Sequence, residues 1–226
     1  MDLDSVLLVG ATGLVGSHCQ KLLLKRPDCQ RVTVLARRPL EATDARVQQM
    51  TIRFEELRSI QLPPMTSVFC ALGTTIRKAG SKAAFREVDF EYPRLIARQA
   101  LAAGAKQFLL VSAVDAEPGS RNFYLRVKGE LEHAIAEMPF ASLHIFRPGF
   151  LLGERRERRR GETAGIAFVK VIQPLLRGSF RRYHSIPAET VAAAMIGAAQ
   201  GGERGCNIYH YDGMLALSRR YDAGLK

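Results

Sequence analysis

The sequence contains no tryptophan, few aromatic residues and no long apolar run. A membrane-spanning helix needs about 20 consecutive apolar residues, so we expect no membrane partner. The N-terminal residues lack the basic start of a signal peptide and the arginine- and serine-rich pattern of a transit peptide. Together these absences predict a cytoplasmic protein.

Cysteine is scarce as well, and the four cysteines of the chain are scattered. Their spacing fits neither a metal site nor a redox pair, and no two histidines have the spacing of a zinc site. We therefore expect no bound metal, and cysteines that act as small buried hydrophobic residues in a reducing compartment. The cysteines are Cys19, Cys29, Cys70 and Cys206.

Acidic residues are outnumbered, because 33 lysines and arginines face 22 aspartates and glutamates and give a formal charge of +11. Such an excess is compatible with nucleic acid, an anionic membrane or an anionic small molecule. The densest basic cluster has hardly any interleaved aromatic side chains, which argues against a surface that stacks nucleic-acid bases. We expect a small-molecule substrate, with an anionic one compatible, and no nucleic acid. The cluster comprises Arg155, Arg156, Arg158, Arg159 and Arg160.

Hydrophobic residues make up 47% of the chain, which is enough for a substantial core. Short apolar runs, typical of strands buried on both faces, alternate with segments of helical periodicity. This alternation predicts an α/β fold with one doubly wound parallel sheet of the Rossmann type in three layers, α/β/α. We expect strands over residues 6–9, 31–36, 50–54, 67–72, 107–111, 142–146 and 206–209, and helices over residues 14–25, 92–103, 123–138 and 189–199.

No low-complexity linker or internal repeat divides the chain, so we expect a single domain over residues 1–226. Residues 1–150 would form the cofactor-binding core. Residues 151–226 are less regular and would form a small irregular substrate cap over the carboxyl edge of the sheet. One histidine of this part, His184, lies where it would face a substrate.

The glycines that follow the first predicted strand are the strongest single motif. Gly10, Gly13 and Gly16 stand at intervals of three, with a strand before them and a helix after them. Glycines in this context give a tight turn, close approach of a phosphate and close packing of the helix, whose N-terminal end attracts a pyrophosphate. We predict a dinucleotide-binding turn made by Gly10, Thr12, Gly13, Leu14, Val15 and Gly16.

The end of the second predicted strand indicates which dinucleotide binds. An NAD-binding protein would place a carboxylate there for the ribose hydroxyls, but this chain has Ala36 followed by Arg37 and Arg38. A carboxylate repels a 2′-phosphate, whereas a guanidinium binds it through charge-assisted hydrogen bonds. The pattern therefore predicts NADP(H) in preference to NAD(H). Two solvated arginines at the start of a loop are the alternative interpretation.

The helix after the fifth predicted strand carries a candidate acid–base group. Tyr124 and Lys128 are four residues apart and share one face of the helix. A phenol is a poor acid or base at neutral pH, and a nearby ammonium favours the phenolate. Ser112, at the carboxyl end of the fifth strand, could polarise a substrate carbonyl beside the phenol. An amphipathic tyrosine and a surface lysine would be the ordinary interpretation of the pair by itself.

Several segments together resemble the short-chain dehydrogenase/reductase superfamily. They are Gly10-Ala-Thr-Gly-Leu-Val-Gly16, Ser112, Tyr124-Leu-Arg-Val-Lys128 and Arg147-Pro-Gly149. More narrowly, the chain resembles the atypical group that contains the Tat-interacting-protein oxidoreductase, over nearly its whole length. That likeness rests on Cys70-Ala-Leu-Gly-Thr-Thr75, Tyr124-Leu-Arg-Val-Lys-Gly-Glu130, Phe146-Arg-Pro-Gly-Phe-Leu-Leu152 and His184-Ser-Ile-Pro187.

The resemblance implies hydride transfer between a nicotinamide and a carbonyl or alcohol substrate. Tyr124 would be the acid–base group, Lys128 would tune it and hold the nicotinamide ribose, and Ser112 would orient the carbonyl. Folds of this type often pair into dimers through buried helix faces, so a homodimer is compatible with the sequence. Further cofactor contacts would come from Leu72, Gly73, Thr74, Thr75, Val111, Pro148 and Phe150.

Two positions depart from the pattern of the superfamily. Asp89 stands where many members have an asparagine with a proton-relay role, which is not carried over to this chain. Arg53 stands where many members have an acidic residue that contacts adenine. Some atypical members bind the cofactor without an established reaction, so a non-catalytic dinucleotide-binding regulator or sensor is the alternative function.

Overall fold

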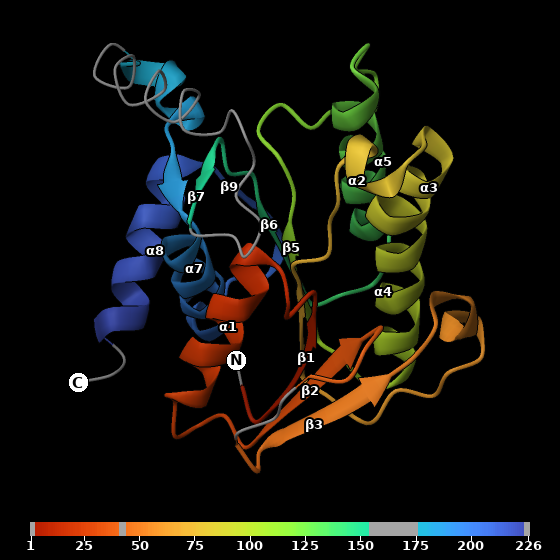
Figure 1. Ribbon diagram of the computed structural model, residues 1–226. Coiled ribbons are helices and arrows are strands. Elements are labelled where there is room, and N and C mark those ends of the chain that lie inside the picture. Colours follow the sequence, from red (N-terminus) through yellow and green to blue (C-terminus); the bar gives the residue numbers. More distant parts are fainter. Residues whose placement is uncertain (1–2, 41–43, 154–175, 224–226) are drawn as a thin grey trace.

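The computed structural model describes residues 3–40, 44–153 and 176–223, and its centre is a seven-stranded sheet (Figure 1). Every neighbouring pair of strands is parallel, in the order β3-β2-β1-β4-β5-β6-β9. The strand order reverses between β1 and β4, which confirms the doubly wound sheet predicted from the sequence. The strands are β1 (Ser5–Val9), β2 (Arg31–Ala36), β3 (Val47–Thr51), β4 (Ser67–Cys70), β5 (Gln107–Val111), β6 (Ser142–Phe146) and β9 (Gly205–Tyr209).

Helices cover both faces of the sheet and complete the three predicted layers. In Figure 1, α1 (Leu14–Leu24), α7 (Ala188–Gly201) and α8 (Tyr211–Ala223) lie on one side, and α4 (Tyr92–Ala102) and α5 (Phe123–Ala136) on the other. A separate hydrophobic cluster fills each of the two interfaces. α4 begins at Tyr92, as predicted, because Pro93 is tolerated in the first turn of a helix.

Several short elements escaped prediction. A helix of four or five residues carries too little periodicity to be recognised, and both short helices depend on a single capping hydroxyl, from Thr75 and from Ser81. The elements are α2 (Ile76–Ala79), α3 (Lys82–Arg86), the 3-10 helices η1 (Phe54–Arg58) and η4 (Gly178–Tyr183), the π-helical turn η2 (Glu87–Glu91), and the paired strands β7 (Leu151–Leu152) and β8 (Ile186–Pro187).

The third strand was predicted over residues 50–54, and this prediction is wrong. The strand runs over Val47–Thr51 at the edge of the sheet, where Gln48 is exposed and Gln49 is half-buried. An edge strand of this kind tolerates polar residues. The prediction relied on apolar residues and therefore placed the strand three residues too late. The fourth strand also ends at Cys70, two residues earlier than expected.

The C-terminal part is more regular than the sequence suggested. α7 packs between α1 and α8 with most of its residues buried, because its alanines and glycines allow close approach of neighbouring helices. β9 completes the sheet beside β6. The arginine cluster at residues 155–160 lies outside the described residues. In the part of the chain that the structure describes, we find no helix with the length and apolarity that a bilayer crossing requires.

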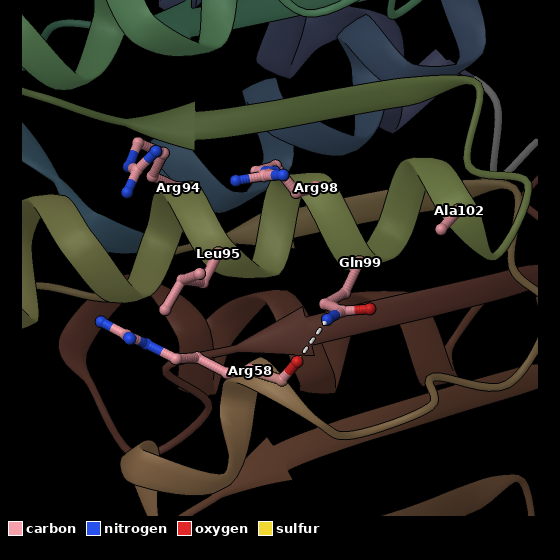
Figure 2. A pocket seen from close by; sticks show the side chains of 6 residues that line it. All are labelled: Arg58, Arg94, Leu95, Arg98, Gln99 and Ala102. Atoms are coloured by element: carbon pink, nitrogen blue, oxygen red, sulfur yellow. Dashed lines mark hydrogen bonds between the residues drawn. The ribbon is translucent and has the colours of Figure 1, made fainter.

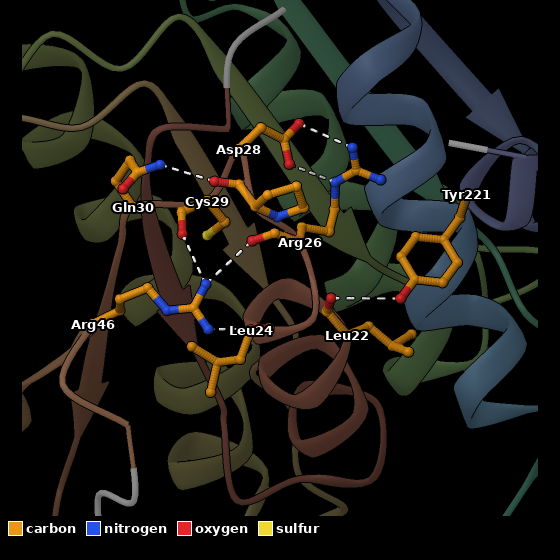
Figure 3. A network of polar contacts seen from close by, with 9 residues as sticks. Leu22, Leu24, Arg26, Asp28, Cys29, Gln30, Arg46 and Tyr221 are labelled. Carbon is orange, nitrogen blue, oxygen red and sulfur yellow. Dashed lines mark hydrogen bonds and ion pairs between the residues drawn. The ribbon is translucent and has the colours of Figure 1, made fainter. Parts of the chain in front are cut away.

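The C-terminal end of α1 is fastened by a network of polar contacts (Figure 3). The guanidinium of Arg46 donates to three backbone carbonyls at and after the end of α1, at distances of 2.5 to 3.2 Å. Positive charge is favourable at this end of a helix. Asp44 accepts from the same guanidinium, which lowers the pKa of Asp44 to about 2. Arg26 pairs with Asp28 beside them, with 2.7 Å between Nε and Oδ1.

Three cysteines, Cys19, Cys29 and Cys70, are buried as predicted. Cys206 is exposed, which contradicts the prediction for that residue. It lies in β9, the edge strand opposite β3, where side chains of one face remain open to solvent.

Candidate functional site

The turn between β1 and α1 is built from backbone packed against backbone. Gly10 has a φ of +87°, and a Cβ added there would lie 2.6 Å from the carbonyl oxygen of Ala71. The N–H of Gly13 donates to the carbonyl of Gly10 at 2.8 Å and closes the turn. A Cβ at Gly16 would overlap the same carbonyl. The geometry therefore requires glycine at Gly10 and at Gly16.

The N-terminal end of α1 fits an anionic group. Its N-cap, Gly13, makes no side-chain hydrogen bond, and the first turn carries no acidic residue. The N–H groups of a first helical turn have no partner within the helix and point along the positive end of the helix dipole. Thr12 is exposed, Leu14 is half-buried and Val15 is buried. This end of α1 has the features that hold a pyrophosphate.

Arg37 and Arg38 follow directly after β2 and are both exposed. β2 lies beside β1 in the sheet, with Leu35 opposite Val9, so the two strands end at the same edge. The arginines therefore lie on the same edge of the sheet as the glycine turn.

The turn after β4 brings predicted site residues from distant parts of the chain together. The N–H of Thr74 donates to Oδ2 of Asp89 at 2.8 Å. A Cβ added at Gly73 would lie 3.3 Å from Oδ1 of Asp89 and 3.6 Å from Nζ of Lys128. Leu72 and Thr75 flank this pair of residues, and both are half-buried. The turn predicted to line the cofactor thus contacts the carboxylate that pairs with the predicted lysine.

Lys128 forms a buried ion pair with Asp89. Nζ lies 2.8 Å from Oδ1, and the two side chains are 5% and 0% exposed. Burial opposes the charged form of Lys128, but the charge of Asp89, with smaller contributions from Tyr124 and Cys70, outweighs it and raises the pKa of Lys128 above its ordinary value. The ammonium is therefore charged at neutral pH, in a place that water hardly reaches.

The start of α5 fixes the position of Tyr124. The side chain of Asn122, the N-cap, accepts hydrogen bonds from two N–H groups of the first turn, that of Tyr124 at 2.9 Å. Tyr124 and Lys128 then lie one turn apart on the same face. The ring of Tyr124 packs against that of buried Phe85, with 5.6 Å between the centroids. At Gly129 a Cβ would overlap the backbone of the loop after β5, so this glycine lets the loop lie against α5.

Ser112 follows Val111, the last residue of β5, and is buried. Its N–H donates to the carbonyl of Phe146 at 2.8 Å, while the N–H of Val114 donates to the carbonyl of buried Pro148 at 3.0 Å. The loops after β5 and β6 are thereby joined. Among the described residues, Oγ of Ser112 has no hydrogen-bond partner. A buried hydroxyl without a partner is costly, and it suits a group that bonds a substrate.

The 3-10 helix η4 reaches the loop after β5. Asp115 has a φ of +59°, which is uncommon for a residue other than glycine, and accepts a hydrogen bond of 2.7 Å from the hydroxyl of Tyr183. The guanidinium of Arg182 lies 3.6 Å from the same carboxylate. Phe150 is 63% exposed. His184 is buried and its Nε2 bonds a backbone carbonyl at 2.9 Å, so its role is structural rather than substrate-facing.

A cavity of about 540 Å³ lies between η1 and α4, away from these residues (Figure 2). Gln99 bridges the two elements, because its Nε2 donates to the carbonyl of Arg58 at 3.3 Å. None of the predicted site residues lines it, so it does not belong to the candidate site. Its lining comprises Arg58, Arg94, Leu95, Arg98, Gln99 and Ala102.

The sequence pointed to most of this arrangement but gave Asp89 no role. Asp89 lies in the π-helical turn η2, and only the packing of η2 against α5 shows that its carboxylate meets Lys128. Asp115 was missed because its backbone conformation has no pattern in the sequence. Within the described ranges, no three histidine, cysteine, aspartate or glutamate side chains gather as they would around a metal ion.

Comparison with known proteins gives the chain its relatives. Residues 6–214 match the profile described as "NAD dependent epimerase/dehydratase family". The protein HTATIP2 of Rattus norvegicus is 37% identical over 202 residues, which cover 87% of this chain and 81% of that protein. The protein FMP52 of Candida albicans is 32% identical over 209 residues, which cover 89% of this chain and 90% of the relative. These matches confirm the resemblance inferred from the sequence.

Solved structures with low sequence identity share the fold. MoeE5 in complex with UDP-glucose and NAD is 15% identical, with a TM-score of 0.66, over 97% of this chain and 82% of that one. The human epimerase family protein SDR39U1 with NADPH is 19% identical, with a TM-score of 0.63, over 91% of this chain and 73% of that one.

The prediction of a cytoplasmic protein is wrong by the same comparison. The relatives from Candida albicans, Coccidioides immitis and Aspergillus fumigatus are named as mitochondrial proteins. The prediction rested on the scattered cysteines and on the lack of a long apolar run. These features do not distinguish one thiol-reducing compartment of the cell from another.

Proposed function

Because the chain belongs to the NAD dependent epimerase/dehydratase family, we propose that it is an NADP(H)-dependent oxidoreductase of the short-chain dehydrogenase/reductase type. It would transfer a hydride between the nicotinamide and a carbonyl or alcohol substrate. The observation that carries the proposal is the buried ammonium of Lys128, placed one turn from Tyr124 and against the Gly73 turn.

Three side chains divide the chemistry between them. The phenol of Tyr124 donates a proton to the carbonyl oxygen during reduction and accepts it during oxidation. The charged Lys128 stabilises the phenolate that this leaves and binds the ribose beside the nicotinamide. The hydroxyl of Ser112, which has no hydrogen-bond partner within the described part of the chain, donates to the carbonyl oxygen and orients it. When bound, the cofactor supplies or accepts the hydride.

The cofactor would lie along the carboxyl edge of the sheet. The glycine turn and the N-terminal end of α1 would hold the pyrophosphate, and Arg37 with Arg38 would bind the 2′-phosphate of NADP(H). Of the structures with this fold, SDR39U1 contains NADPH and MoeE5 contains NAD, so the fold is compatible with either dinucleotide. The preference for NADP(H) therefore rests on the two arginines.

The first experiment titrates the chain with NADPH and with NADH, following nicotinamide fluorescence. We expect tighter binding of NADPH than of NADH. Arg37→Ala should reduce this difference in affinity, whereas Arg219→Ala, which removes an exposed charge on α8, should leave it unchanged. Preference for NADH would overturn the role of Arg37. Failure to bind either nucleotide would overturn the proposed function.

Tyr124→Phe tests the acid–base group. Turnover of carbonyl substrates with NADPH should fall by about 100-fold or more, with nucleotide affinity nearly unchanged. Tyr221→Phe on α8 serves as the control, because its hydroxyl lies 3.5 Å from the carbonyl oxygen of Leu22, near the C-terminal end of α1. Full activity of Tyr124→Phe would sink the mechanism, and NADPH binding without turnover of any carbonyl in the wild type would favour a regulator instead.

A further inference from the structure

We propose that Asp89 is a positioning residue of this site, whose carboxylate holds the Lys128 ammonium and the Gly73–Thr74 backbone in one fixed arrangement. The inference rests on the proposed function, since it assigns Asp89 a task in presenting Lys128 to the nicotinamide ribose and to Tyr124. Asp89 would thus act through Lys128 and not on the substrate.

The two oxygens of the carboxylate have separate partners from different elements. Oδ1 lies 2.8 Å from Nζ of Lys128, on α5. Oδ2 accepts the N–H of Thr74 at 2.8 Å, in the turn after β4. The backbone of Gly73 lies beside both groups, since an added Cβ would lie 3.3 Å from Oδ1 of Asp89 and 3.6 Å from Nζ of Lys128. One side chain therefore sets the distance between the predicted cofactor turn and the predicted lysine.

Burial keeps solvent from screening this contact, and it makes the loss of either partner costly. The Asp89 side chain is 0% exposed and that of Lys128 5% exposed, so solvent does little to screen the pair. The charged and titratable groups that face Lys128 are Asp89 on η2, Tyr124 on its own helix and Cys70 at the end of β4. Burial raises the pKa of Cys70 to about 11, so its thiol is neutral at neutral pH. The carboxylate of Asp89 is what compensates the buried ammonium.

The segment that carries Asp89 also supports Tyr124. Asp89 lies in the π-helical turn η2, between α3 and α4, and single π turns are frequent at functional sites. Phe85, in α3 just before this turn, packs its buried ring against Tyr124. The region α3–η2 therefore contacts both members of the Tyr124–Lys128 pair. An asparagine at this position would keep an acceptor for Thr74 but would not compensate the charge of Lys128.

The pair is tested first in the cofactor-free chain by urea unfolding at pH 7. Lys128→Met leaves a buried carboxylate without its cation, and Asp89→Asn leaves a buried ammonium without its anion, so each lowers the urea midpoint. Adding Asp89→Asn to Lys128→Met should raise the midpoint again, because no unpaired buried charge remains. Additive losses, or a double variant that does not fold, would overturn the proposal. A single variant that fails to fold while the double variant folds supports it.

The positioning role is tested by NADPH titration of the same proteins. Asp89→Asn should weaken NADPH binding about tenfold, because the Lys128 ammonium is no longer held in place to donate its hydrogen bond to the nicotinamide ribose. It should cause no further loss in the Lys128→Met background, because Asp89 acts through Lys128. Glu87→Gln is the control, since Glu87 is an exposed carboxylate of the same π turn.

The outcomes separate this inference from the proposed function. Equal NADPH affinity for wild type and Asp89→Asn, compared at equal folded fraction, would make the pair structural only and overturn the positioning role. If the wild type binds neither NADPH nor NADH, the proposed function fails, and with it the positioning role. The urea experiment still decides whether Asp89 holds Lys128.

Discussion

Two buried ion pairs lie one turn apart on α5 and serve different parts of the molecule. Lys128 pairs with Asp89, with 2.8 Å between Nζ and Oδ1, and Glu132 pairs with Arg147, with 3.1 Å between Oε1 and Nε. In both pairs the member on α5 is nearly inaccessible to solvent. The pairs are alike in chemistry and burial, and they differ in the groups around them.

The partners of α5 connect it to different places. Asp89 also binds the N–H of Thr74 in the turn that is predicted to line the cofactor. The N–H of Arg147 donates to the carbonyl of Tyr209 in the edge strand β9, so this pair fastens α5 to the edge of the sheet. A buried charge by itself therefore does not identify a functional residue. The groups that surround the buried charge do.

The largest expected effect concerns the pair at the sheet edge. Arg147→Met leaves the carboxylate of Glu132, whose side chain is 6% exposed, without its cation. The free energy of unfolding should fall by about 3 kcal/mol or more, measured by urea unfolding at pH 7. Lys128→Met should also lower the free energy of unfolding. Of the two variants, only Lys128→Met should bind NADPH more weakly than the wild type when the affinities are compared at equal folded fraction. An equal loss of affinity in both variants would break the comparison.

A substitution at Gly10 tests the candidate site without removing a charge, because Gly10 lies in the predicted cofactor turn. Gly10 and Gly80 have φ values of +87° and +86°, but a Cβ would meet the Ala71 carbonyl at Gly10 and open space at Gly80. Gly80→Ala should cost about 1 kcal/mol of stability from backbone strain alone. Gly10→Ala should cost about 2 kcal/mol or more and weaken NADPH binding. Identical urea midpoints for the two variants would refute the close approach.

The smallest effect is expected at a pair that is partly exposed, Asp44 and Arg46. The hydrogen bond from Arg46 lowers the pKa of Asp44 from its ordinary 3.8 to about 2. The unfolded chain thus binds this proton first, so the stabilisation is present above about pH 4 and is lost as the pH falls towards 2. The difference in urea midpoint between wild type and Asp44→Asn should be small at pH 7 and vanish in acid. A loss as large as that of Arg147→Met would show that burial does not set the effect.

Much of the fold follows from local patterns in the sequence. The apolar runs of β1, β2, β5 and β6 and the periodicity of α1, α4 and α5 are present within each segment, and the structure confirms these elements. β3 was predicted three residues too late, because this edge strand carries polar residues such as Gln48 and lacks a continuous apolar run. α8 was missed because only Met214, Leu217 and Tyr221 among its residues are buried, which makes its pattern sparse.

The candidate site divides in the same way. The structure places Ser112 after β5 and the glycines in a tight turn, in the positions that the spacing predicted, and Tyr124 and Lys128 share a face because they are one helical turn apart. The partner of Lys128 had no such signal, because Asp89 belongs to another element and its register is set by a π turn. His184 was expected to face a substrate, but packing against Tyr211 buries it.

The sequence by itself determined most strands of the sheet, the helices α1, α4, α5 and α7, where glycine is required, and which side chains share a face of α5. These properties depend on spacing over a few residues. Only the tertiary structure decided that α7 is buried between two helices, that β9 is the edge strand beside β6, and that the carboxylate of Asp89 compensates the charge of Lys128. Such contacts join segments far apart in the chain, and their energy comes from packing and from the loss of solvent screening on burial, which no local pattern records.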